Sequence, residues 1–139
     1  YKVGCEIDNT PALFDTVPGA RKWPITADSS RPETISYMRR HGYENITHAR
    51  KGKGSVEEGI EFLKTFDIVV HERCKHMIDE LAFYKDDGDK KTIEGCPVLK
   101  DEKNHLIDAL RYAVEPTRRA TGGVVAAPLI LSAARPGPG

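Results

Sequence analysis

The sequence has no long apolar run, no net charge and few cysteines. Its longest uncharged apolar stretch, residues 124–131, is interrupted by Pro128 and is far shorter than the ~20 residues of a membrane-spanning helix. The 21 basic and 21 acidic side chains cancel, which disfavours a polybasic nucleic-acid binder but does not exclude a local basic patch. Three cysteines at wide spacings fit neither a disulfide framework nor a paired-cysteine metal site. We therefore expect a soluble protein from a reducing, intracellular compartment.

The residues that are present describe one ordinary globular domain. The chain has 139 residues, 39% hydrophobic and 30% charged, which is enough for a modest core and not typical of a disordered protein. It begins at Tyr1 without a charged-then-apolar leader, and we expect it to be a fragment or a processed piece. Gly, Ala and Pro dominate from Thr117 onward, so we predict a domain over residues 1–116 and a flexible tail over 117–139.

The zero net charge is a cancellation between two neighbouring segments. Residues 31–54 contain six basic and two acidic side chains, a net charge of +4. Residues 55–80 contain three basic and seven acidic side chains, a net charge of −4. The chain is therefore polarised along its length, and its first half carries a basic region.

Short runs of β-type residues alternate with segments of helical periodicity, which predicts an α/β fold with partly parallel strands. The predicted strands are residues 23–27, 45–49 and 67–71. The predicted helices are residues 30–41, 55–66, 74–84 and 104–115, the last of them stopped by Pro116. A polar turn at 86–89 is expected to lead into a hairpin that ends near residue 99.

Two of the predicted helices begin with a capping box. In this motif a hydroxyl accepts a hydrogen bond from the amide three residues on, and a Glu at that position reaches back. Ser30 with Glu33, and Ser55 with Glu58, have the required spacing. Both helices are therefore expected to start at a serine cap.

Asp28 is the first candidate functional residue, because it comes directly after the strand 25–27 and before a helix. A carboxylate at the carboxyl end of a strand lies where open α/β sheets assemble their sites. The same position also suits a residue that only caps the following helix. Since Ser30 already supplies the predicted cap, Asp28 is not needed for capping and is available for a functional role.

Asp108 is the second candidate. The apolar stripe of its helix consists of Leu106, Ile107, Leu110, Ala113 and Val114. Asp108 falls on the opposite face together with His105, Arg111 and Tyr112, and its position alone favours a solvated face. An Asp with a His one turn before it and a Tyr one turn after it could also line a polar site.

The basic, glycine-rich segment KGKGS at residues 51–55 is a candidate phosphate-binding element. It is not a nucleotide-binding loop, because a Gly separates Lys53 from Ser55 where the motif requires Lys followed directly by Ser or Thr. A basic approach to a helix N-terminus can still bind a DNA phosphate. Arg50, Lys51 and Lys53 are therefore candidate DNA contacts, and a solvated turn is the alternative.

Two further patterns are weaker. Residues 6–10 (EIDNT) approximate the start of haloacid dehalogenase-type phosphatases, but Glu6 stands where the nucleophilic Asp is required. His71, Cys74 and His76 offer only three crowded ligands for zinc, with no distant pair to complete a tetrahedron. We therefore expect structural histidines and a buried thiol there.

Three sequence blocks taken together resemble one known family. They are ITADSSRPETI at 25–35, KGKGSV at 51–56 and NHLIDALRY at 104–112. In order and spacing they resemble the nuclease domain of the large terminase subunit of tailed bacteriophages, over about residues 1–115. The resemblance implies a ribonuclease H-like fold, an α/β mixed sheet flanked by helices.

The resemblance also implies a truncation. The first acidic ligand of the family lies on a first strand that should precede Tyr1, so we expect this chain to lack that strand. Asp8 is the nearest upstream acid, but its surroundings look like the start of a helix. The ATPase domain of the family is absent from these residues as well.

The function that the resemblance implies is metal-dependent cleavage of double-stranded viral DNA during genome packaging. By position, Asp28 matches the second acidic ligand and Asp108 the third, which would make them the catalytic, metal-binding carboxylates for Mg²⁺ or Mn²⁺. Expected partners are double-stranded DNA, the portal and the small terminase subunit, without a membrane and in the cytoplasm of a bacterial host. The alternative is a catalytically inactive DNA-binding or packaging-interaction fragment.

Overall fold

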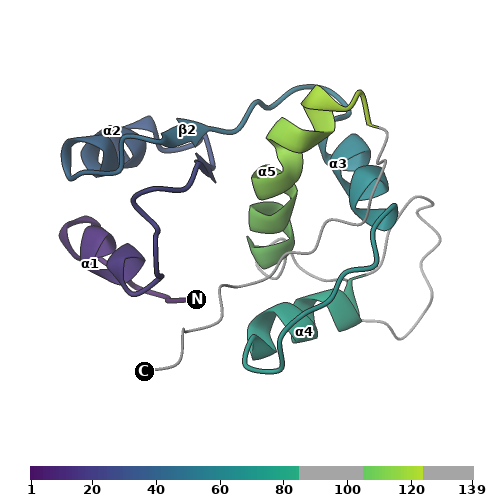
Figure 1. Cartoon of the computed structure of the whole chain (residues 1–139), viewed down its shortest axis with the longest axis horizontal. Helices are drawn as coiled ribbons and strands as arrows, with labels where there is room; N and C mark the ends of the chain where they lie inside the picture. Colours follow the sequence, from purple (N-terminus) through teal and green to yellow (C-terminus); the bar gives the residue numbers. More distant parts are fainter. Residues whose placement is uncertain (85–104, 124–139) are drawn as a thin grey trace.

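The computed structural model describes residues 1–84 and 105–123 and combines helices with a small parallel sheet (Figure 1). In chain order the elements are a 3-10 turn (Ile7–Asn9), α1 (Thr10–Asp15), β1 (Ile25–Ala27), α2 (Pro32–Arg40), β2 (Ile46–His48), α3 (Ser55–Lys64), α4 (Lys75–Phe83) and α5 (His105–Ala120). β1 and β2 pair in parallel, with Ile25 opposite Ile46 and Ala27 opposite His48. This arrangement fits the predicted α/β class, while the larger mixed sheet and the missing first strand stay predictions.

The apolar side chains gather in two clusters. The first joins α2 to the sheet and contains Ile35, Met38, Tyr43 and Ile46. The second joins α3 to α5 and contains Ile60, Phe62, Leu63, Ile107 and Val114. α5 also packs against α4 and β1, so this helix connects the sheet to α3 and α4 (Figure 1).

A buried tyrosine ties α1 to the chain between α2 and β2. Tyr43 is only 1% exposed, and its hydroxyl donates to Asp15 Oδ1 at 2.6 Å and lies 3.0 Å from the carbonyl oxygen of Pro11. Arg21 donates to both oxygens of Asp15 at 2.8 Å. The hydrogen bonds from Arg21 and Tyr43 lower the pKa of Asp15 to about 2, so this carboxylate is ionised at neutral pH.

Both predicted capping boxes are wrong, although both helices form. α2 has Arg31 as its N-cap and α3 has Gly54, and neither start has a side-chain cap hydrogen bond. Gly54 has φ of +79°, a left-handed conformation that turns the chain one residue before the serine. Ser55 is therefore the first residue of α3, and its hydroxyl accepts from the Gly52 amide at 3.3 Å.

The predicted strand at 67–71 is also wrong. These residues form neither strand nor helix, and Val69 is 82% exposed. A β-type run becomes a strand only when a neighbouring strand supplies backbone partners, and the described residues place none beside it. The next segment follows the prediction closely, because α4 begins after Cys74 and ends before Tyr84.

The last described helix runs further than the sequence predicts. α5 continues through Pro116 to Ala120, so residues 117–120 form its last turn instead of the start of a tail. Pro116 is exposed, where the loss of one backbone donor is tolerated more easily than in a packed segment. The predicted hairpin after 86–89 and residues 124–139 lie outside the described residues. None of the described helices is long and apolar enough to cross a membrane.

Met38 tests the first cluster, because its side chain is 1% exposed and packs from α2 into the cluster that contains Ile46 of β2. Met38→Ala should lower the free energy of unfolding by about 2–5 kcal/mol through lost burial and the cavity left behind. Met77→Ala, the same change at a half-buried position of α4 outside both clusters, should cost less than half as much. Urea unfolding followed by circular dichroism measures both, and equal losses would contradict the assigned core.

Candidate functional site

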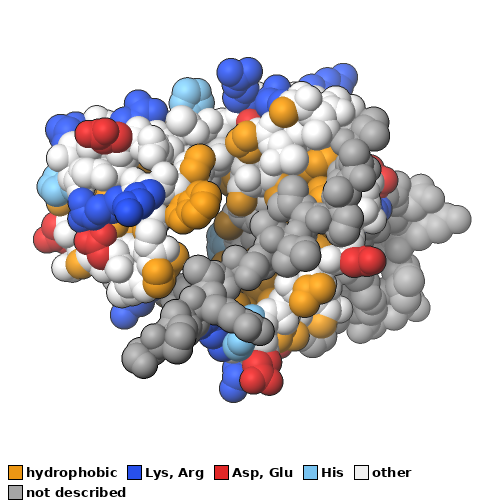
Figure 2. Space-filling model, viewed as in Figure 1, with side chains coloured by type: hydrophobic (Ala, Val, Ile, Leu, Met, Phe, Trp, Pro, Cys, Tyr) orange, Lys and Arg blue, Asp and Glu red, His pale blue; other side chains and the backbone are white. Residues whose placement is uncertain are grey.

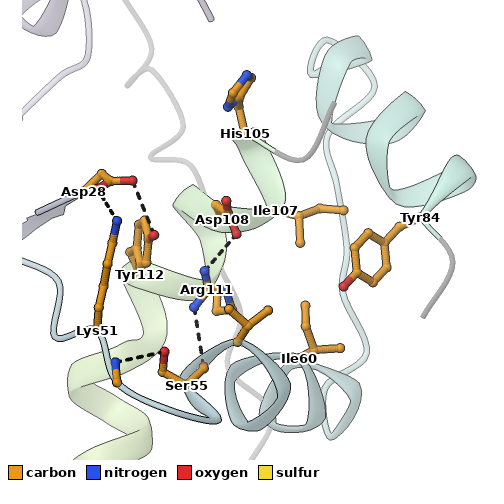
Figure 3. A pocket seen from close by; sticks show the side chains of 12 residues that line it. Asp28, Lys51, Ser55, Ile60, Tyr84, His105, Ile107, Asp108, Arg111 and Tyr112 are labelled. Carbon is orange, nitrogen blue, oxygen red and sulfur yellow. Dashed lines mark hydrogen bonds and ion pairs between the residues drawn. The ribbon is translucent and has the colours of Figure 1, made fainter. Parts of the chain in front are cut away.

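Asp28 lies at the carboxyl end of β1, where the chain turns toward α2. Its Oδ1 accepts a hydrogen bond from the Ser30 amide at 2.7 Å, which is the local turn that Asp side chains commonly make. The prediction that Ser30 caps the helix is wrong, because the N-cap of α2 is Arg31 and has no side-chain cap hydrogen bond. Asp28 forms the turn itself, and its carboxylate still extends beyond the strand end (Figure 3).

Lys51 reaches Asp28 from the loop between β2 and α3. Its Nζ lies 2.7 Å from Asp28 Oδ1, and the side chains of Lys51 and Asp28 are 48% and 49% exposed. The hydrogen bond from Lys51 is the main reason why the pKa of Asp28 falls to about 2. The pKa of the Lys51 ammonium is raised for the same reason. Both groups are therefore charged at neutral pH.

Asp108 and Arg111 form a second pair on α5. Arg111 Nη2 donates to Asp108 Oδ1 at 2.8 Å, and Arg111 Nη1 donates to the Ser55 carbonyl oxygen at 3.4 Å. The Arg111 side chain is only 8% exposed, whereas that of Asp108 is 43% exposed. Burial is the largest single influence and lowers the pKa of Arg111, but the hydrogen bond to Asp108, the charge of Asp108 and the contact with Tyr112 together outweigh it, so the pKa of the guanidinium is raised.

The Arg111 side chain packs between its own helix α5 and α3, because α3 has a glycine, Gly59, where the side chain lies against it. A Cβ atom on Gly59 would overlap Cγ and Cδ of Arg111. The guanidinium lies over the ring of Tyr112 with 4.7 Å between the guanidinium carbon and the ring centroid. Arg111 Nε is buried and has no hydrogen-bond partner among the described residues.

Tyr112 connects the two pairs. It is 7% exposed, and its hydroxyl lies 3.5 Å from Asp28 Oδ2, at the outer limit of a hydrogen bond (Figure 3). A cavity of about 630 Å³ lies at this junction. The polar side chains that line it belong to Asp28, Lys51, Ser55, Tyr84, His105, Asp108, Arg111 and Tyr112. The structure therefore brings both candidate carboxylates to one cavity.

The three candidate basic residues are placed differently. Lys51 lines the cavity, whereas Arg50 and Lys53 are exposed beside it and do not line it. The backbone amide of Arg50 donates to Glu115 Oε1 at 3.1 Å, which fixes the loop against α5. In the space-filling view, basic side chains stand along the upper edge of the molecule (Figure 2).

The His71, Cys74 and His76 segment does not come together as a ligand cluster. His71 Nδ1 accepts from the Arg73 amide at 3.1 Å, and the His76 ring packs against Tyr1 with 4.7 Å between ring centroids. Cys74 is exposed as the N-cap of α4, so the expectation of a buried thiol is wrong.

Comparison with known proteins identifies the family. A family model described as "Terminase RNAseH like domain" matches residues 18–116. This chain belongs to that terminase family. It is also 37% identical over 101 residues to the protein named "Terminase, large subunit" of Bacillus phage SPP1, which covers 70% of this chain. The chain spans 24% of the length of that curated relative. No solved structure matches the present chain.

The donor set of this terminase RNase H-like domain fits only part of a divalent-metal site. Carboxylate oxygens are the hard ligands that such cations prefer, and Asp28 and Asp108 present them at one cavity. Within residues 1–84 and 105–123, no group of three His, Cys, Asp or Glu side chains is arranged to hold an ion. Asp28 and Asp108 could therefore supply two carboxylates, with further oxygen ligands left to water or to other residues.

Sequence reasoning missed the burial of Arg111 and Tyr112 in this terminase domain. Both were placed on the polar face of the helix, yet both are buried, while Ala113 of the expected apolar stripe is exposed. The i,i+3 spacing from Asp108 to Arg111 was the available signal, because it predicts a contact on one helix face. It could not reveal that α3 covers the pair.

Gly59→Ala tests the packing of Arg111. Replacing Gly by Ala inside a helix normally raises the free energy of unfolding by about 1 kcal/mol. Here the new Cβ would overlap the packed Arg111 side chain, which costs about 1–3 kcal/mol. We expect a net loss of about 1 kcal/mol in the free energy of unfolding, measured by urea denaturation. Gly52→Ala is the matched control, because no heavy atom lies within 4 Å of a Cβ at Gly52. A stabilised Gly59→Ala protein would contradict the packing.

Proposed function

We propose that this chain is the nuclease part of a terminase and cuts double-stranded viral DNA during genome packaging in a metal-dependent reaction. The observation that carries the proposal is the meeting of Asp28, from the end of β1, with Asp108, from α5, at one cavity. Membership of the terminase RNase H-like family supports a nuclease function. The relative from phage SPP1 is itself named a terminase large subunit.

Asp28 and Asp108 would hold the divalent cations, Mg²⁺ or Mn²⁺, through their carboxylate oxygens. Two such ions, when bound, activate a water and stabilise the leaving oxygen in phosphodiester hydrolysis. Arg111 restrains the orientation of Asp108 through its 2.8 Å hydrogen bond. Tyr112 lines the same cavity, with its hydroxyl 3.5 Å from Asp28 Oδ2.

DNA would approach over the loop between β2 and α3. Arg50, Lys51 and Lys53 are candidates for contacts to backbone phosphates, because they lie in or beside the cavity at the start of α3. Proposed protein partners are the portal and the small terminase subunit of the packaging motor. The proposed place of action is the cytoplasm of the bacterial host.

Nicking of plasmid DNA in the presence of Mn²⁺ tests the proposal. Asp28→Asn and Asp108→Asn should each reduce the nicking rate by at least roughly 10–100-fold, the loss seen when even an outer partner of a metal ligand is removed. Asp79→Asn is the matched control, because Asp79 is exposed on α4 and does not line the cavity. Wild-type nicking that persists in Asp108→Asn would refute the role of Asp108.

A catalytically inactive DNA-binding or packaging-interaction fragment is the second candidate function. The observation that favours it is that no group of three His, Cys, Asp or Glu side chains among the described residues is arranged to hold a metal ion. With two carboxylates, each ion would keep much of its water shell and bind weakly. The basic segment 31–54 would then be the functional part of the chain.

Salt-dependent binding to a DNA duplex separates the two candidates. Both predict binding that weakens steeply as salt rises, but only the nuclease predicts cleavage with Mn²⁺. Arg50→Ala and Lys53→Ala should each lower the slope of log affinity against log salt by about 1 if they contact phosphates. Lys75→Ala, on α4, should leave the slope unchanged. The absence of any DNA binding at low salt would contradict both functions.

A further inference from the structure

Each candidate metal-binding carboxylate already has a cationic side chain against it. Lys51 Nζ lies 2.7 Å from Asp28 Oδ1, and Arg111 Nη2 lies 2.8 Å from Asp108 Oδ1 (Figure 3). The described residues therefore neutralise the two carboxylates by internal ion pairs. A divalent cation that binds there must share or displace those partners.

The two ion pairs differ in how firmly the cation is held. The Arg111 side chain is 8% exposed and is fixed by Asp108, by the Ser55 carbonyl and by packing against Gly59. It cannot leave without opening the contact between α3 and α5. We therefore expect the Arg111 pair to persist whether or not a cation is present.

Lys51 is held far less firmly. Its side chain is 48% exposed and carries a compact ammonium on a flexible stem. The next residue, Gly52, has no heavy atom within 4 Å of a Cβ position, so space is open beside the loop. An exposed ion pair of this kind favours the paired state by up to about fivefold. Separating Lys51 from Asp28 therefore costs little free energy.

We propose that Lys51 occupies the position at Asp28 that a divalent cation takes, and that Lys51 leaves Asp28 when the cation binds. This inference rests on the proposed metal-dependent function. The released ammonium stays at the cavity entrance, because its backbone is anchored by the neighbouring Arg50 amide on Glu115. There it can bind a DNA phosphate, which it cannot do as well while paired with Asp28.

The release of Lys51 couples two binding events. Without the cation, Lys51 is satisfied by Asp28 and adds little to DNA binding. With the cation bound, Lys51 becomes an additional phosphate contact. Cation and DNA therefore strengthen each other's binding through one side chain, and this reciprocity is required by thermodynamic linkage.

Mn²⁺ binding to the purified full chain, measured by isothermal titration calorimetry, is the first test. Lys51→Met removes the competing ammonium and should tighten Mn²⁺ binding by about three- to tenfold. Lys53→Met removes the same charge from the same loop, at a position that does not line the cavity, and should change the Mn²⁺ affinity by less than about twofold. An equal effect of both variants, or no effect of Lys51→Met, would overturn the inference.

Binding of a short DNA duplex, measured by fluorescence anisotropy with and without Ca²⁺, is the second test. Lys53→Met should weaken DNA binding equally in both conditions, whereas Lys51→Met should weaken it only when Ca²⁺ is present. Weakening by Lys51→Met without Ca²⁺ of the same size as with it would overturn the release of Lys51.

The two proposals fail in different ways. If wild-type chain binds Mn²⁺, Asp28→Asn abolishes that binding and Lys51→Met leaves it unchanged, the metal site stands and the release of Lys51 is wrong. If wild-type chain binds no Mn²⁺ at millimolar concentration, both the metal site and the release of Lys51 are wrong.

Discussion

The buried guanidinium of Arg111, packed between α5 and α3, fixes the position of these two helices on either side of the cavity. A buried charge must be paired, and Arg111 finds its partners in Asp108 on its own helix and in the Ser55 carbonyl at the start of α3. The two helices can therefore pack closely only in the register that provides both partners. Gly59 gives the side chain its room, so one glycine and one arginine set the distance between two elements that the chain separates widely.

That register also decides what faces the sheet. With Arg111 placed against α3, the adjacent Tyr112 turns toward the end of β1 and reaches Asp28. The two carboxylates then meet at one cavity with unequal partners, since Arg111 is packed and Lys51 is half exposed. The structure thus combines a carboxylate on α5 held by a packed arginine with a carboxylate at the end of β1 whose lysine partner is half exposed. Under the proposed function, this pairing would combine a rigid ligand with one that ions and DNA can reach.

Much of the fold follows from local patterns in the sequence. Periodicity placed the helices at 32–40, 55–64 and 75–83 and the two short strands to within about two residues of their observed ends. The residues that cap the helix starts were harder to predict than the helices themselves, because capping depends on which backbone amide a side chain can reach. The N-cap residues are Arg31 for α2 and Gly54 for α3, and neither helix start has a side-chain cap hydrogen bond, so neither serine caps its helix. The run at 67–71 lacks a strand for a different reason, since pairing requires a neighbour that local sequence cannot specify.

The sequence by itself determined the candidate carboxylates, the polarised charge and the terminase resemblance, because these depend on residue types, their order and their spacing. The family is confirmed, while the roles of Asp28 and Asp108 as metal ligands stay predictions. Only the tertiary structure decided that Arg111 and Tyr112 are buried and that Lys51 pairs with Asp28. The physical reason is that burial and ion pairing depend on groups brought in by other elements. An amphipathic pattern shows which face of a helix is apolar, but not which neighbour covers a charge.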